Sequence, residues 1–117
     1  MAASIAVIVI DCVDSEPVAE FWMAALGYEV AARDGTWIKL RDPDGVGPPL
    51  AIDPVPEAKI VKNRVHLDLK PSGTMEAEVA RLEQLGARVA RVFPGDHTIM
   101  LDPEGNEFCV VEPHSIA

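Results

Sequence analysis

The chain has 117 residues, 49% of them hydrophobic, and a formal net charge of −9. These values suit one compact domain, or two half-size modules sharing a core, and not a disordered chain. The 19 acidic against 10 basic residues argue against nucleic acid and anionic membranes as partners, since both attract clustered Lys and Arg. No apolar run reaches the ~20 residues of a membrane span and no signal peptide is evident, so we expect a cytoplasmic protein.

The first half of the chain predicts a strand, a helix and three further strands. β-Branched residues favour a strand over residues 4–13. Ser15 is a suitable N-cap for a helix whose apolar residues recur at helical spacing as far as Leu26, and Gly27 ends this helix. Three strands follow, separated by turns at Asp34-Gly35 and at residues 42–45; they are predicted over residues 28–32, 36–41 and 50–53.

The second half predicts the same order after a proline-containing linker at residues 54–62. A strand is expected over residues 64–69, and Thr74 is the predicted N-cap of a helix that runs to Gly86. Three more strands are predicted over residues 88–93, 98–101 and 107–112. Cys12 and Cys109 both lie in apolar strand segments, where a reduced, buried thiol is the usual state.

Short sequence matches show that the second half repeats the first. Leu26-Gly27 is matched by Leu85-Gly86 (86 − 27 = 59), and Asp42-Pro43-Asp44-Gly45 by Asp102-Pro103-Glu104-Gly105 (102 − 42 = 60). A repeat of half the chain indicates two copies of one supersecondary unit. We therefore predict an α+β fold, a single domain over residues 1–117 with two βαβββ modules at about residues 4–53 and 63–113. The modules would form a curved mixed sheet with a concave groove and with the helices outside.

This order of elements resembles the vicinal oxygen chelate superfamily of glyoxalases, extradiol dioxygenases and bleomycin-resistance proteins. The segments that carry the resemblance are Phe21-Trp22 with Leu26-Gly27, Asn63-Arg64-Val65-His66-Leu67-Asp68-Leu69, and Asp102-Pro103-Glu104-Gly105-Asn106-Glu107-Phe108. The second segment is similar to a glyoxalase-like subgroup often left without an assigned reaction. The resemblance covers essentially the whole chain. It implies a homodimer, because members of the superfamily build their sites by pairing modules within one chain or across a dimer.

The resemblance also implies where metal ligands would lie, on the first and last strands of each copy. Carried over through the repeat, these positions are Val7, Leu50, His66 and Cys109. Val7 and Leu50 have no ligand atom, and a divalent ion needs two or three protein ligands in fixed geometry. We therefore expect no metal cofactor. If an ion does bind, His66 and Cys109 are its ligands, with Asp53, Asp68 or Glu107 as candidate additional donors.

Four further side chains are candidate ligand contacts, each with a structural alternative. Trp37 could stack on a flat ligand or pack in the core. Asn63 and Arg64 could donate hydrogen bonds to a carbonyl or anionic group, or could fix the linker. Cys109 could act as a nucleophile or be an inert buried thiol. The default position for His97 and His114 is the surface.

His66 is the main candidate for chemistry, because the imidazole pKa lies near neutrality. It is predicted to contact a ligand together with Asp68, although a strand histidine satisfied by Asp68 is the structural alternative. We predict a small-molecule-binding protein that sequesters a ligand or drug without the usual metal site. The alternative is a glyoxalase-type lyase or isomerase that uses His66 with Glu107 or Asp68 for proton transfer. A partner-binding module without a ligand is a third reading, and whether the protein is an enzyme stays open.

Overall fold

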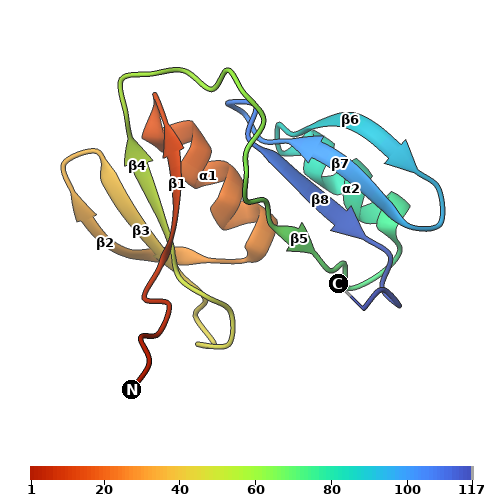
Figure 1. Cartoon of the computed structure of the whole chain (residues 1–117), viewed down its shortest axis with the longest axis horizontal. Helices are drawn as coiled ribbons and strands as arrows, with labels where there is room; N and C mark the ends of the chain where they lie inside the picture. The colour runs from red at the N-terminus through yellow and green to blue at the C-terminus, as the bar shows by residue number, and fades with distance from the viewer. Residues whose placement is uncertain (117) are drawn as a thin grey trace. The chain divides into compact units, whose positions relative to one another are not determined.

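The computed structural model describes residues 1–116 and divides the chain into two compact units, Met1–Ala58 (unit 1) and Lys59–Ala117 (unit 2). Each unit contains a strand, a helix and three strands in that order (Figure 1). This confirms the predicted α+β class and the two βαβββ modules. No helix within residues 1–116 combines the length and the apolar character that a membrane crossing requires.

Unit 1 packs one helix, α1 (Ser15–Leu26), against a four-stranded sheet. Its strands are β1 (Ile8–Cys12), β2 (Glu29–Asp34), β3 (Trp37–Arg41) and β4 (Leu50–Pro54). The order across the sheet is β1-β4-β3-β2, with β1 parallel to β4 and the other pairs antiparallel. The apolar side chains buried between helix and sheet include Val18, Phe21, Trp22, Ile38, Leu40, Leu50 and Ile52.

Unit 2 repeats this arrangement with helix α2 (Met75–Gln84). Its strands are β5 (Asp68–Leu69), β6 (Arg88–Phe93), β7 (His97–Leu101) and β8 (Glu107–Val111). The order is β5-β8-β7-β6, again with one parallel pair, between β5 and β8. The buried side chains include Met75, Leu82, Met100, Phe108 and Val110.

The structure corrects three predicted boundaries. β1 begins at Ile8, whose amide donates to the Pro49 carbonyl, rather than at residue 4. β5 comprises only Asp68 and Leu69, which are the residues that pair with β8, so residues 64–67 are not strand. The first of these predictions rested on β-branched composition, and both ignored that a strand also needs a neighbour that supplies hydrogen bonds. Ser15 is the first helical residue, and Asp14 is the N-cap.

The helix signals at Thr74 and Gly27 are confirmed. The Thr74 hydroxyl accepts a hydrogen bond from the Ala77 amide at 3.1 Å, as an N-cap does. Gly27 follows α1 with φ of 70°, a left-handed conformation that glycine adopts without steric cost. Of the capping residues predicted from local signals, Thr74 and Gly27 therefore hold their predicted positions, whereas Ser15 does not.

The repeated Asp-Pro-x-Gly segments are structural turns closed by their first aspartate. Asp42 accepts hydrogen bonds from the amides of Asp44, Val46 and Gly47. Asp102 accepts them from the amides of Glu104 and Asn106 and from the Asn106 side chain, at 2.9–3.1 Å. Asp102 is completely buried. The buried carboxylate is thus satisfied within its own turn.

Strand pairing corrects the internal register of the last strand in each unit. Leu40 pairs with Leu50 in unit 1, and Met100 pairs with Phe108 in unit 2. The counterpart of Leu50 is therefore Phe108, and that of Cys109 is Ala51 (109 − 51 = 58). Matching Cys109 to Leu50 was wrong by one residue, because the connection after the Asp-Pro turn is shorter in unit 2. Ala51, like Leu50, offers no ligand atom.

Candidate functional site

A pocket of about 270 Å³ lies within unit 2. Strand β8 contributes Cys109 and Val111, while His66 and Asp68 come from the segment that leads into β5 and from β5 itself. The remaining lining residues are Asp96 and His97, at the start of β7, and Ser115 near the C-terminus. The pocket therefore gathers four titratable side chains and a thiol from segments that are far apart in the sequence.

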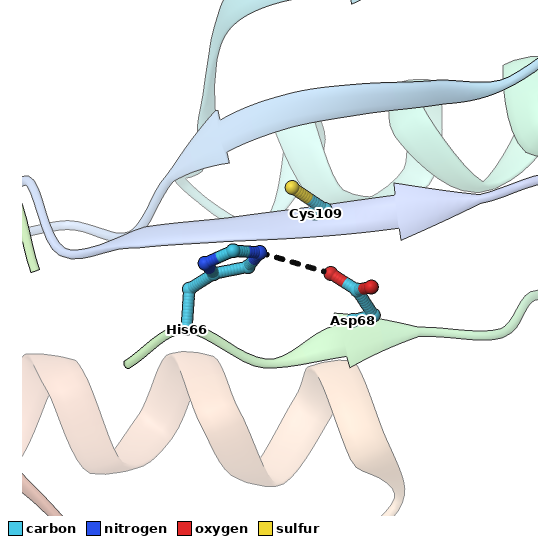
Figure 2. Close-up of side chains that lie close together, drawn as sticks. All are labelled: His66, Asp68 and Cys109. Carbon is cyan, nitrogen blue, oxygen red and sulfur yellow. Dashed lines mark ion pairs between the residues drawn. The ribbon is translucent and has the colours of Figure 1, made fainter. Parts of the chain in front are cut away.

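Three of the residues that line this pocket, His66, Asp68 and Cys109, lie close together (Figure 2). The imidazole Nε2 of His66 lies 3.3 Å from Asp68 Oδ1, and one ligand atom from each of the three residues lies within 4.8 Å of the others. Asp68 pairs with Cys109 across the parallel β5–β8 ladder. His66 precedes Asp68 by two residues, the spacing that places side chains on one face of an extended chain.

The thiol of Cys109 is protonated at neutral pH. Burial, together with the negative charge of Asp68 and the hydrogen bond to it, raises the thiol pKa from 9.0 to about 11. A thiol attacks as its thiolate, so an elevated pKa works against a nucleophilic role. Unless a ligand displaces the thiol proton, these surroundings favour the alternative in which Cys109 is an inert buried thiol.

A second histidine–aspartate pair lines the same pocket. His97 Nδ1 lies 3.0 Å from Asp96 Oδ2, and the imidazole stacks on Phe93 with ring centroids 4.5 Å apart. The Arg91 guanidinium lies over the Phe93 ring, also at 4.5 Å. His97 was expected at the surface, and its pairing with Asp96 was not predicted. No local sequence signal marks it, because His97 reaches the pocket through the pairing of β7 with β8, in which it lies opposite Val111.

Glu107 does not line the pocket, although it was a predicted catalytic residue. Its carboxylate accepts hydrogen bonds from the Asn63 amide at 2.9 Å and from Lys59 Nζ at 3.0 Å. Burial alone would raise the Glu107 pKa, but these two donors outweigh it and hold that pKa below its usual value. Glu107 thus fastens residues 59–63 to β8, which favours the linker role for Asn63.

Arg64 and Trp37 also lie outside the pocket lining. Arg64 is exposed. Trp37 is at the start of β3 in unit 1 and is partly exposed. Their predicted contacts with a ligand stay predictions. Of the six predicted ligand-binding residues, the pocket unites His66, Asp68 and Cys109.

The residues present do not fit a four-ligand metal centre with equal contributions from both copies. The unit 1 positions that correspond to His66 and Cys109 are Val7 and Ala51, and neither side chain can coordinate a metal. Unit 2 alone presents three donors, a nitrogen, an oxygen and a sulfur, in His66, Asp68 and Cys109. Three donors of these types suit one small ion of borderline softness. An ion held by three protein ligands would keep one coordination position open, where it would act as a Lewis acid.

Comparisons with known proteins agree with the architecture. A family model described as "Glyoxalase-like domain" matches residues 7–111. A search of curated proteins found no match. A possible glyoxalase from Bacillus cereus is 21% identical, with a TM-score of 0.70, covering 94% of this chain and 99% of its own. The fosfomycin resistance protein FosX from Mesorhizobium loti is 13% identical, with a TM-score of 0.76, covering 99% and 95%. The Leishmania major trypanothione-dependent glyoxalase I is 15% identical, with a TM-score of 0.73, covering 96% and 88%.

Proposed function

The chain belongs to the glyoxalase-like domain family, and from this premise we propose that it binds a small organic molecule in the unit 2 pocket without needing a metal ion. The observation that carries the proposal is the His66–Asp68–Cys109 cluster inside that pocket. Its counterparts in unit 1, Val7, Val9 and Ala51, are apolar. The polar groups are thus confined to one copy of the repeat, at a concave site, as expected for ligand recognition rather than for folding.

The lining of the pocket combines polar side chains, which can form directional hydrogen bonds, with a smaller apolar surface. Asp68 Oδ1 lies 3.3 Å from His66 Nε2, so whenever Nε2 alone carries the ring proton, Nδ1 of the same ring is an acceptor for a ligand. Asp96 and His97 supply a second carboxylate–imidazole pair, and Val111 and Cys109 supply apolar surface. The two carboxylates favour a ligand that carries a positive charge or several hydrogen-bond donors.

The proposed role is sequestration of such a compound. The similar fold of a fosfomycin resistance protein supports a role in handling foreign small molecules. We place this activity in the cytoplasm and in a homodimer, and light scattering of the purified protein tests the dimer. These assignments depend on the family, since a fold hosts many functions.

A lyase or isomerase of the glyoxalase type is the second candidate. The His66–Asp68 pair is the observation that favours it, because a carboxylate that orients an imidazole makes a competent acid–base pair. His66 would take the proton from a carbon next to a carbonyl, and Asp68 would hold the ring. Glu107 is not the partner in this version, since its carboxylate is held by Lys59 and Asn63.

A thermal-shift screen of chelator-treated protein tests the binding proposal. Cationic and aromatic compounds are added to the wild type, to His66→Gln and to the matched control His114→Gln, whose histidine is exposed and outside the pocket. A ligand at a hundred times its Kd should stabilise the protein by about 2.7 kcal/mol. We expect this stabilisation in the wild type and His114→Gln and its loss in His66→Gln. No stabilisation by any compound contradicts the proposal, and turnover unaffected by His66→Ala contradicts the enzymatic version.

A further inference from the structure

We propose that Asp96 and His97 form a second recognition subsite in the unit 2 pocket, one that takes the flat cationic group of an aryl amidine or aryl guanidine. This subsite rests on the proposed binding function and narrows it to one class of ligand. It lines the same pocket as His66, Asp68 and Cys109 but consists of other residues.

The pair exists because the β6–β7 hairpin of unit 2 has a longer turn than the β2–β3 hairpin of unit 1 (Figure 1). In unit 1, Asp34 pairs with Trp37 across two turn residues. In unit 2, Phe93 pairs with His97 across three, the last of which is Asp96. His97 thus stands where unit 1 has Trp37, and Asp96 has no counterpart. Since the hairpin of unit 1 forms without such a pair, the fold does not require it.

The His97 ring is held on two sides. Its Nδ1 lies 3.0 Å from Asp96 Oδ2, and the ring stacks on Phe93 with an interplanar angle of 14° and centroids 4.5 Å apart. The Asp96 backbone is itself fixed, because its amide donates to the Phe93 carbonyl and its carbonyl accepts from the Glu112 amide, both at 3.0 Å. The imidazole is therefore positioned before a ligand arrives, which lowers the entropy that binding would cost.

Each member of the pair keeps one polar atom for a ligand. Among residues 1–116, neither Asp96 Oδ1 nor His97 Nε2 makes a hydrogen bond. A carboxylate oxygen is an acceptor, and Nε2 is one whenever Nδ1 alone carries the ring proton. A matching ligand therefore presents hydrogen-bond donors to this side of the pocket.

The charges of the pocket lining favour a cation. The lining contains the carboxylates of Asp68 and Asp96 and no Lys or Arg from the described part of the chain. Arg91 lies over the Phe93 ring at 4.5 Å, and Lys62 Nζ donates to a backbone carbonyl 3.3 Å away. An anionic ligand would therefore meet carboxylates of its own sign inside the pocket.

A guanidinium or amidinium group fits these features better than an ammonium group. A guanidinium is planar and delocalised, is more weakly hydrated than an ammonium, and holds its N–H donors in a fixed fork. An amidinium shares this planarity. Hydrogen bonds from such a cation to a carboxylate are charge-assisted and among the stronger ones in proteins. The pocket of about 270 Å³ suits a compound with a single aromatic ring, which would contact the apolar surface of Val111.

Calorimetric titration of the full chain with four one-ring compounds of similar size tests the ligand class. Benzamidine carries the planar cation, benzylamine an ammonium, benzamide a neutral amide and benzoate an anion. We expect benzamidine to bind the wild type about 10-fold more tightly than benzylamine or benzamide, and benzoate not to bind. Equal affinities for benzamidine and benzamide, or no binding of benzamidine, overturn the proposal.

Variants of the pair test its two residues. Asp96→Asn removes the charge and His97→Leu removes the acceptor, so each should weaken benzamidine binding about 10-fold. The matched controls, Asp44→Asn and His114→Leu, change exposed residues outside the pocket lining and should bind as the wild type does. Far-UV circular dichroism checks that each variant is folded. Wild-type affinity in a folded Asp96→Asn or His97→Leu protein overturns the assignment.

Phe93 acts through His97 and is a positioning residue. Phe93→Leu should weaken benzamidine binding, whereas Phe93→Tyr, which keeps an aromatic ring, should bind as the wild type does. The ring current of residue 93 shifts the imidazole proton signals of His97 in NMR spectra, so this shift should disappear in Phe93→Leu and persist in Phe93→Tyr. A Phe93→Leu protein that loses the shift but keeps wild-type affinity contradicts this role.

These titrations and the thermal-shift screen give separate answers. A compound that requires His66 but binds equally well to Asp96→Asn and His97→Leu would support the proposed function and contradict the amidine subsite. Benzamidine binding that requires Asp96 and His97 but not His66 would support the subsite and contradict the role given to His66. If no compound binds in either experiment, both proposals are wrong.

Discussion

The two units share one architecture but differ at three equivalent positions. Val9 pairs with Ala51 in unit 1, as Asp68 pairs with Cys109 in unit 2, and two residues before these strand positions are Val7 and His66. Unit 1 forms its sheet with apolar side chains at all three positions. The fold therefore does not require the polar cluster of unit 2, which agrees with the proposal that this cluster binds a ligand. The strand pairing common to both units is what the fold needs, and the three polar side chains belong to unit 2 alone.

The same comparison applies to the turns and to the start of the last strand. Asp102 is completely buried, whereas its counterpart Asp42 is partly exposed. Glu107 precedes Phe108 and binds Lys59, whereas Pro49 stands at the corresponding place before Leu50. At these two places unit 2 therefore has a buried turn and a part-buried ion pair, whereas unit 1 has a more exposed turn and a proline. Three measurements test this difference.

The largest expected effect is that of Asp102→Ala. Removing the carboxylate leaves the amides of Glu104 and Asn106 and the Asn106 side chain without their acceptor, in a buried turn. We expect a loss of about 3 kcal/mol in the free energy of unfolding. Urea denaturation followed by far-UV circular dichroism measures it. Tryptophan fluorescence would report unit 1, which contains both Trp22 and Trp37.

Asp42→Ala is the matched variant in unit 1 and should cost clearly less, because water can replace the lost acceptor at a partly exposed turn. Equal losses for the two variants would show that burial does not distinguish the turns.

The next effect concerns the reactivity of Cys109. With a thiol pKa of about 11 instead of 9.0, the thiolate fraction at pH 8 falls roughly 100-fold. In a Cys12→Ser background, alkylation by iodoacetamide should be correspondingly slow and should accelerate as the pH approaches 11. Because the charge and hydrogen bond of Asp68 contribute to the raised pKa, Asp68→Asn should increase the rate. A rate typical of an exposed thiol, or one insensitive to Asp68→Asn, would contradict this description.

The smallest effect is expected for Glu107→Gln. Glutamine can still accept from the Asn63 amide, but it removes the charge opposite Lys59, in a pair whose side chains are only 16–17% exposed. We expect a loss of about 1 kcal/mol in the free energy of unfolding at pH 7.

The pH dependence of this effect follows from the lowered Glu107 pKa. A carboxyl whose pKa is lower in the folded state stabilises the protein above its unfolded pKa, and this contribution disappears as the pH falls through the folded pKa. Denaturation of wild type and Glu107→Gln should therefore converge in acid. A difference that stays constant with pH would point to packing rather than charge.

Much of the fold was predictable from local signals. Thr74 and Gly27 were recognised because capping and left-handed turns depend on a few neighbouring residues. The short β5 was not, because its length depends on which residues β8 reaches. His66, Asp68 and Cys109 could be grouped from the repeat and from strand alternation. His97 was missed, since nothing local connects it with Cys109, which is on the neighbouring strand.

The sequence by itself determined the repeated βαβββ order, because period, capping and turn residues act over a few neighbouring positions. It also showed that the first copy has no ligand atoms at the positions equivalent to His66 and Cys109. Only the tertiary structure decided that Asp96 and His97 line the same pocket as Cys109, while Glu107 is bound to Lys59. These relations depend on which strands become neighbours and in what register, and a register shift of one residue reverses the face on which a side chain lies.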